Sequence, residues 1–206
     1  MNNLIPIFPL NIVVFPYSKI PLHIFEEKYK KMIGKCLNEK TGFGIVSIIK
    51  KELSKIGSYV EITNVLNKYA NGEMDIIVEG TERFKVIEKQ PHPDGYLIGE
   101  VEGYSDISKE FDKNLLEELR TNFVSILNKI NFKLEDAFWE NYKSSELKSY
   151  KIAEKSGLTL EQQQRFLALQ KENQRIGFLL KHLEKLEKKL SENIATGAII
   201  MGDGYL

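Results

Sequence analysis

A proline-punctuated apolar segment near the N-terminus decides the fold of this chain. Residues 5–22 read IPIFPLNIVVFPYSKIPL, and each of the four prolines is followed by further apolar residues. Proline lacks a backbone N–H and has a fixed φ, so within a sheet it is confined to edge strands and to strand ends. The segment therefore predicts extended edge strands, which the prolines protect against the addition of another strand.

Short β-branched runs follow, with one helix between them. Residues 12–15 and 43–49 are expected to form strands. Between these runs, apolar residues recur at intervals of three and four, which places them on one helical face. They are Phe25, Tyr29, Met32, Ile33, Cys36 and Leu37. We expect this helix to pack on the sheet.

The segment 59–104 predicts an antiparallel meander. Asn71-Gly72 is typical of a hairpin with a type I′ turn, because both central residues of that turn need a positive φ. One strand is expected to stop at Gly80, and PHPDG at residues 91–95 indicates another reversal. Several short strands joined by tight turns favour a sheet curled toward a small barrel or sandwich.

Beyond residue 106 the hydrophobic period becomes helical. One apolar stripe covers residues 111–130, with Asp106 or Ser108 as the N-cap. A second helix is expected over residues 146–155 and should end at Gly157, which suits the left-handed position after a helix.

Two further helices complete this region. Thr159 and Gln162 have the spacing of a capping box, which starts a third helix. The fourth covers residues 176–190, where isoleucine and leucine alternate at spacings of three and four. We expect an intramolecular bundle, and the alternative is a coiled-coil dimer.

Composition and charge exclude several classes of protein. Lys plus Arg equals Asp plus Glu at 29 each, and a division after Asp106 leaves neither half basic, which counts against nucleic acid as a partner. No apolar run reaches the ~18 residues of a membrane span. The single cysteine and the lack of a signal peptide predict a cytoplasmic protein.

The motifs of common enzyme classes are missing. The Gly-Lys pair at residues 34–35 lacks both the first glycine and the hydroxyl of a phosphate-binding loop. His23, His92 and His182 are far apart and lack metal-ligand spacing. Cys36 is predicted to be a small core residue rather than a nucleophile. We expect no catalytic residues, no cofactor and no metal.

Three motifs, in order, resemble those of the amino-terminal substrate-binding domain of Lon proteases. The first is an apolar run that ends in Phe-Pro and is followed by an apolar Pro-Leu. The second is a hydrophobe-Gly-x-x-hydrophobe strand start, and the third is V-E-G-x-x-R. The residues that carry them are Pro9, Phe15, Pro16, Pro21, Gly57, Gly80 and Arg83.

The resemblance covers residues 5–101, and less specifically the helices through Leu190. It implies an α+β fold: a PUA-like antiparallel pseudo-barrel or sandwich with one inserted helix in residues 1–106, then a helical bundle in 107–193. Residues 194–206 form an apolar, Gly-rich tail, either disordered or docked on its own domain or a neighbour. Nothing matches the Walker motifs or the Ser/Lys dyad of Lon, so we expect a stand-alone, non-catalytic relative.

In Lon this domain recognises unfolded or tagged proteins, so the leading expectation is an adaptor or holdase for unfolded or extended polypeptides. A AAA+ protease or a second copy of the chain is a possible partner. Aromatic residues near turns are the candidates for peptide contact, with burial in the core as the alternative for each. They are Phe8, Tyr17, Tyr69 and Tyr96.

Two other functions stay open at this stage. The first is RNA binding by a PUA-like barrel, and the second is an undetected small-molecule or enzymatic role. Arg83 is expected to tie two strands together by donating to backbone carbonyls. Gly80 is expected to need a positive φ between strands.

Overall fold

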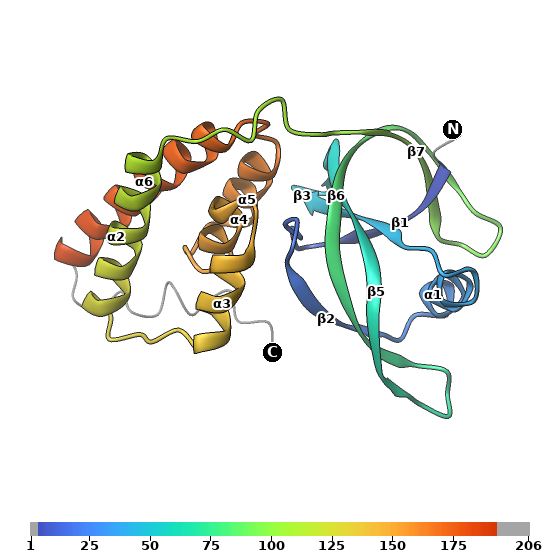
Figure 1. The fold of residues 1–206 in the computed structure, drawn as a ribbon. Coiled ribbons are helices and arrows are strands. Elements are labelled where there is room, and N and C mark those ends of the chain that lie inside the picture. The colour runs from blue at the N-terminus through green and yellow to red at the C-terminus, as the bar shows by residue number, and fades with distance from the viewer. Residues whose placement is uncertain (1–3, 193–206) are drawn as a thin grey trace. The chain divides into compact units, whose positions relative to one another are not determined.

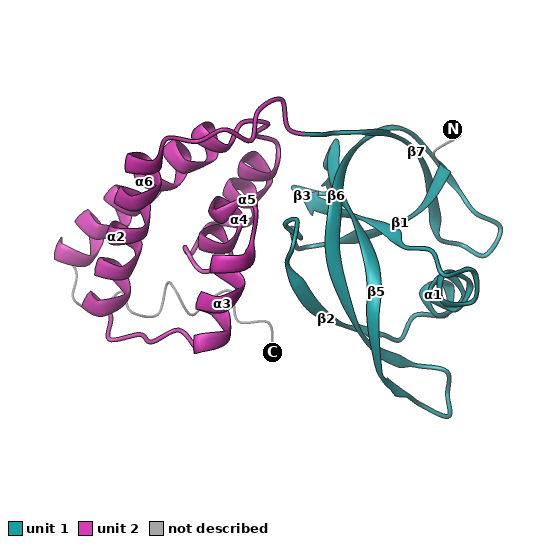
Figure 2. Cartoon of the chain, viewed as in Figure 1, with its two compact units in different colours: residues 1–105 teal, residues 106–206 magenta. Residues whose placement is uncertain are grey.

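The computed structural model describes residues 4–192. The chain divides into two compact units, Met1–Ser105 and Asp106–Leu206 (Figure 2). The division precedes Asp106, one residue before the predicted domain boundary. The predicted apolar tail, 194–206, lies outside the described residues.

The first unit combines strands with a single described helix (Figure 1). The elements are β1 (Leu4–Leu10), β2 (Lys19–Ile24), α1 (Glu27–Glu39), β3 (Phe43–Ile49), β4 (Glu52–Leu53), β5 (Ile56–Lys68), β6 (Met74–Pro91) and β7 (Leu97–Gly103). Five strands close into a barrel in the order β1-β7-β6-β5-β3, and β3 returns to β1. The β1–β3 pairing is parallel and the other pairings are antiparallel. The predicted α+β fold with one inserted helix is confirmed.

β6 is long enough to serve two parts of the sheet. Its C-terminal half pairs with β7 in the barrel. Its first residues, 74–79, pair with β2 on one side and with the end of β5 on the other. We call this three-stranded region the arm: β2, residues 61–68 of β5 and residues 74–79 of β6 (Figure 1).

Glycines leave room for a large side chain inside the barrel. A Cβ on Gly57 would lie 2.7 Å from Cζ of Phe84, and a Cβ on Gly44 would lie 2.5 Å from the same atom. Phe84 packs there with Ile7 and Val46. The glycine of the strand-start motif is thus required by the packing of Phe84.

A larger core lies between the sheet and α1. The buried face of the helix consists of Tyr29, Met32, Ile33 and Cys36, as the periodicity predicts. Phe25 was expected on the same face, but it is exposed. The helix begins at Glu27, so Phe25 precedes it and does not follow its period.

Residues 12–15 do not form a strand, contrary to the prediction. Three of the four side chains are buried, but side-chain hydroxyls satisfy the backbone. Ser47 Oγ donates to the carbonyl of Ile12 at 2.6 Å, and Ser58 Oγ donates to that of Val14 at 2.5 Å. From an apolar run alone, a segment whose carbonyls accept from side-chain hydroxyls looks the same as a strand whose carbonyls accept from a neighbouring strand.

Gly80 neither ends a strand nor has a positive φ, and both expectations are wrong. β6 runs through it, and the β5–β6 register shifts beside it, so that Thr81 is the extra residue. A Cβ on Gly80 would lie 2.3 Å from the carbonyl oxygen of Phe15. Glycine is needed for this close approach of two backbones rather than for its φ.

The two hairpin loops that the sequence predicts, 70–72 and 93–95, each have three residues. In each, the N–H of the residue before the loop donates to the carbonyl of the residue after it, at 2.9 Å for loop 70–72 and 2.7 Å for loop 93–95. Each loop ends in a glycine with positive φ, 83° at Gly72 and 91° at Gly95. Both predicted reversals are present. The type I′ turn is wrong, because Asn71 does not have a positive φ.

The described part of the second unit consists of helices and the loops that join them. Its helices are α2 (Lys113–Lys129), α3 (Asp136–Ser144), α4 (Lys148–Ala153), α5 (Leu160–Leu167) and α6 (Glu172–Glu192). The N-cap of α2 is Asp112, which accepts from the N–H groups of Asn114 and Leu115, so the predicted caps Asp106 and Ser108 are wrong. The capping box at Thr159 is confirmed. α3 is a helix that the sequence patterns did not predict.

The predicted helical stripes meet inside this unit. α2 and α6 lie side by side (Figure 1), and Lys129 at the end of α2 forms an ion pair with Glu187 of α6. The buried apolar residues on these two helices are Leu119, Phe123, Ile126, Leu127, Ile176, Leu179, Leu183 and Leu186. The apolar stripes of α2 and α6 thus pack within one chain, as the predicted intramolecular bundle requires.

Candidate functional site

An exposed aromatic cluster lies at the end of the arm. The ring of His23 on β2 stacks with that of Phe25 at 5.9 Å between centroids and meets the ring of Tyr69 edge-on at 6.2 Å. Phe25 is 59% exposed and Tyr69 is 45% exposed. Leu66, at a register shift of β5, is 53% exposed. We call Phe25, Leu66 and Tyr69 the arm surface.

One carboxylate holds the polar groups of this cluster. Asp75 lies beside His23 and Asn67 in the strand register. Its Oδ2 accepts from Tyr69 Oη at 2.6 Å and from Asn67 Nδ2 at 2.9 Å. Its Oδ1 lies 2.7 Å from His23 Nδ1, which must carry the proton because a carboxylate only accepts.

These donors also fix the charge of Asp75. The hydrogen bonds from Tyr69, Asn67 and His23, in that order, lower the pKa of Asp75 to about 2. The side chain is therefore a carboxylate at neutral pH, and it orients the two rings on either side of it. Side chains held in advance lose less conformational entropy when a ligand binds.

The four aromatic residues predicted to contact peptide lie in different environments. Phe8 and Tyr96 are buried, so their rings belong to the core. Tyr17 is half-buried, with a φ of 68°. Tyr69 is exposed and is part of the arm surface.

Two members of the arm surface were missed. Phe25 was assigned to the buried face of the helix, although it precedes two glutamates that begin a solvated helical turn. Leu66 follows Val65 in an apolar pair between Asn64 and Asn67, and a single exposed leucine is a weak signal on its own. Their common location on the arm depends on strand register, which local sequence patterns do not predict.

The family-motif residues are structural. Pro9 lies in the half of β1 that pairs with β3, and Pro21 lies in β2, which pairs with β6 alone among the described strands. Phe15 and Pro16 are buried. Arg83 is also buried, with its guanidinium 5.3 Å from the ring of Tyr104, whose N–H donates to the Arg83 carbonyl at 2.8 Å.

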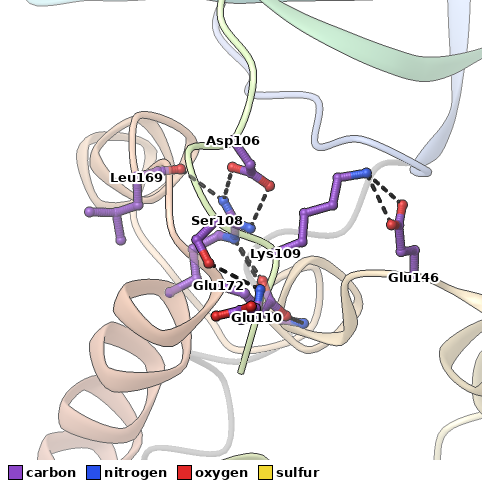
Figure 3. A network of polar contacts seen from close by, with 9 residues as sticks. Asp106, Ser108, Lys109, Glu110, Glu146, Leu169 and Glu172 are labelled. Atoms are coloured by element: carbon purple, nitrogen blue, oxygen red, sulfur yellow. Dashed lines mark hydrogen bonds and ion pairs between the residues drawn. The ribbon is translucent and has the colours of Figure 1, made fainter. Parts of the chain in front are cut away.

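A buried ionic network lies in the helical unit (Figure 3). Arg175 is 0% exposed and donates to both carboxylate oxygens of Asp106, at 2.7 and 2.8 Å. It also donates to Glu172 at 2.8 Å and to the carbonyl of Leu169 at 2.8 Å. Glu172 in turn accepts from the hydroxyl of Ser149 at 2.7 Å. The network fixes Asp106, the first residue of the unit, on α6 and is closed to a ligand.

Groups with potential chemistry elsewhere are few. Burial raises the pKa of the Cys36 thiol, so it is protonated and a poor nucleophile. Across residues 4–192, no three His, Cys, Asp or Glu side chains are placed to hold a metal ion. Over the same residues, none of the helices has the length and apolar character needed to cross a membrane.

Two curated proteins are similar to this chain, one over most of its length and the other over about half of it. The chain is 28% identical over 214 residues to Lon protease of Buchnera aphidicola subsp. Acyrthosiphon pisum, covering 92% of this chain and 27% of that protein. It is 29% identical over 107 residues to Lon protease of Buchnera aphidicola subsp. Baizongia pistaciae, covering 48% of this chain and 14% of that protein. The chain thus spans a little over a quarter of the first relative.

Solved structures share the fold. The Lon N-terminal domain protein from Xanthomonas campestris superposes with a TM-score of 0.66 at 25% identity, covering 87% of this chain and 98% of that chain. The N-terminal domain of Mycobacterium avium complex Lon protease has a TM-score of 0.67 at 16% identity, covering 88% and 98%. Residues 4–185 match the ATP-dependent protease La (LON) substrate-binding domain, and the chain therefore belongs to that family.

Proposed function

We propose that this chain binds extended apolar segments of unfolded polypeptides through the arm surface, as a non-catalytic module. The observation that carries the proposal is the exposure of Phe25 and Tyr69, whose rings both contact the ring of His23, together with the exposure of Leu66 on β5 of the arm. Exposed apolar side chains that gather in one place mark interaction sites. A substrate-binding module of the Lon family needs such a surface, and the family match is to the substrate-binding domain.

The arm also offers backbone groups to an extended ligand. Pairing of β5 with β3 ends at Val60, and from Glu61 onward the described strands give β5 one partner, β6. An open strand edge presents N–H and C=O groups to another extended chain. Register shifts between Ile62 and Asn64, and again near Leu66, interrupt this edge, so we expect only a short stretch of backbone pairing.

In this role the chain is an adaptor or a holdase, with a AAA+ protease or a second copy of itself as a candidate partner. Equal numbers of basic and acidic residues give it no net attraction for polyanions. Binding should therefore depend on apolar contact rather than on charge.

The test compares the affinity of an unfolded client for wild type with its affinity for variants of this chain. Reduced, carboxymethylated α-lactalbumin, which cannot refold, is titrated with wild type and with the Phe25→Ser, Leu66→Ser double variant, and binding is followed by fluorescence anisotropy. Burying each of these side chains contributes about 1.5–3 kcal/mol, so we expect the double variant to lose at least ~10-fold in affinity. The matched control is Ile107→Ser, which removes a 70% exposed side chain from the helical unit.

Two outcomes would contradict the proposal. One is equal affinity of wild type and the double variant when both melt at the same temperature. The other is binding that falls steeply between about 50 and 200 mM salt, since that dependence marks a polyanion site rather than an apolar one.

A further inference from the structure

A second site opens at the other end of β5, at the mouth of the barrel. The pocket has a volume of about 430 Å³. Its floor includes Ile7 and Val46, both buried in the barrel interior beside Phe84, and its walls include the partly buried Leu53 and Val86. The pocket is therefore an apolar opening onto the barrel core, deep enough for one large apolar side chain.

Lysine side chains line the rim of this pocket. Lys89 pairs in register with Gly99, and a Cβ on Gly99 would lie 2.9 Å from Cγ1 of Ile7, so this row of residues faces the barrel interior. The carbonyl of Lys55 accepts from the N–H of Val86 at 2.8 Å, which places Lys55 beside the same strand. Neither ammonium group has an ion-pair partner within residues 4–192.

The remaining polar groups favour an anion. Ser54, also in the lining, has a hydroxyl that can donate. Glu88 is the one carboxylate in the lining, and it pairs in register with Glu100. Because successive residues of a strand point to opposite faces, Glu88 lies on the face of β6 opposite to Lys89. The inner rim is thus positively charged above an apolar floor.

We propose that this pocket binds the C-terminal residue of a polypeptide. A large apolar side chain enters the mouth of the barrel, and the α-carboxylate lies between the ammonium groups of Lys55 and Lys89 with the Ser54 hydroxyl as a further donor. Among the residues of an unfolded chain, the last one alone carries an apolar side chain and a free carboxylate together. The inference rests on the proposed function for its ligand class and adds selectivity for the chain end.

The test uses labelled peptides that differ only at the C-terminus. Peptides of one sequence, with an N-terminal fluorophore, end in leucine as the free acid, in leucine as the amide, or in glycine as the free acid. We expect the leucine acid to bind at least ~10-fold more tightly than the other two. Lys55→Gln and Lys89→Gln should each reduce the preference for acid over amide, whereas the control Lys85→Gln, on the same strand, should not.

The outcomes separate this site from the arm surface. Equal binding of acid and amide would contradict the proposal that the pocket binds a chain end. An acid preference unchanged by Lys55→Gln and Lys89→Gln would contradict it as well. In both cases the unfolded client could still bind the arm surface. Loss of the acid preference in the Phe25→Ser, Leu66→Ser variant would also contradict the pocket proposal, because it would place the chain end at the arm. Lysine-dependent binding of dodecanoate without binding of any peptide acid would assign the pocket to an anionic amphiphile instead.

Discussion

Gly80 meets the backbone of Phe15 so closely that a Cβ on Gly80 would lie 2.3 Å from the Phe15 carbonyl oxygen. The contact is closed by two hydrogen bonds: Tyr17 N–H donates to the Gly80 carbonyl at 2.7 Å, and Gly80 N–H donates to that of Ser18 at 3.0 Å. Two family motifs, the Phe-Pro segment and the V-E-G segment, therefore meet at one point. This docking of a loop on β6 explains why the second motif has a glycine at residue 80.

Gly80→Ala should destabilise the protein strongly. The added methyl group would displace one of two hydrogen-bonded backbones, and overpacking of this kind costs about 1–3 kcal/mol. Chemical denaturation, followed by the β-sheet circular dichroism of the first unit, measures the change in the free energy of unfolding. The matched control is Gly34→Ala in α1, where no atom lies within 4 Å of the new Cβ and alanine should stabilise by about 1 kcal/mol. Equal changes in the free energy of unfolding at the two positions would show that the backbone at Phe15 can move away from a methyl group without loss of stability.

Local patterns predicted those elements whose residues follow a period or a turn rule. The buried face of α1, strand β3, both hairpin positions and the capping box at Thr159 all follow from neighbouring residues. α3 was missed because it is short and its N-cap, Glu135, makes no side-chain cap hydrogen bond.

Prediction of the arm surface would require the pairing register of strands that are far apart in the sequence. His23 contacts Asp75 across 52 residues, and the register shift between Val65 and Asn67 brings Asn67 rather than Leu66 opposite Asp75. A one-residue shift moves every side chain to the other face of a strand, so no local pattern predicts which residues are exposed together. The same argument explains why Phe8 and Tyr96 were proposed as contacts although both are buried.

Arg175→Met should destabilise the helical unit by about 3–5 kcal/mol, because it leaves the buried carboxylates of Asp106 and Glu172 without their cation. Helical circular dichroism in urea measures the loss. The control is Arg120→Met, which breaks the exposed pair with Glu117 and should cost at most about 1 kcal/mol. Similar small effects for both variants would mean that water reaches the carboxylates of Asp106 and Glu172.

Acid should destabilise the helical unit through His182. Burial, the largest cause, and the nearby Lys185 and Lys189 lower the pKa of His182 from 6.5, although its Nε2 bonds to the Ser156 carbonyl at 2.7 Å. The folded state then binds fewer protons than the unfolded state, so stability is full above pH 6.5 and is lost as pH falls toward the folded pKa. His182→Gln should lose less stability than wild type between about pH 7.5 and 5. Identical pH profiles of unfolding free energy would contradict this assignment.

Residues 1–105 should fold when expressed alone. The barrel closes through the β1–β3 pairing and has its own interior of Ile7, Val46 and Phe84, so its strands do not need the helices to satisfy their hydrogen bonds. Circular dichroism should show a β spectrum and a cooperative thermal transition. A fragment that is unfolded or aggregated would show that the helical unit is required to complete the β fold.

Hydrogen exchange with and without an unfolded client tests the polypeptide-binding surface most directly. Addition of reduced, carboxymethylated α-lactalbumin should slow amide exchange in residues 61–75, which hold the open edge of β5 and two residues of the arm surface, Leu66 and Tyr69. Exchange in α2 should stay unchanged. The same slowing should be absent in the Phe25→Ser, Leu66→Ser variant. Client binding that protects α2 or α6 and leaves residues 61–75 unchanged would contradict the account.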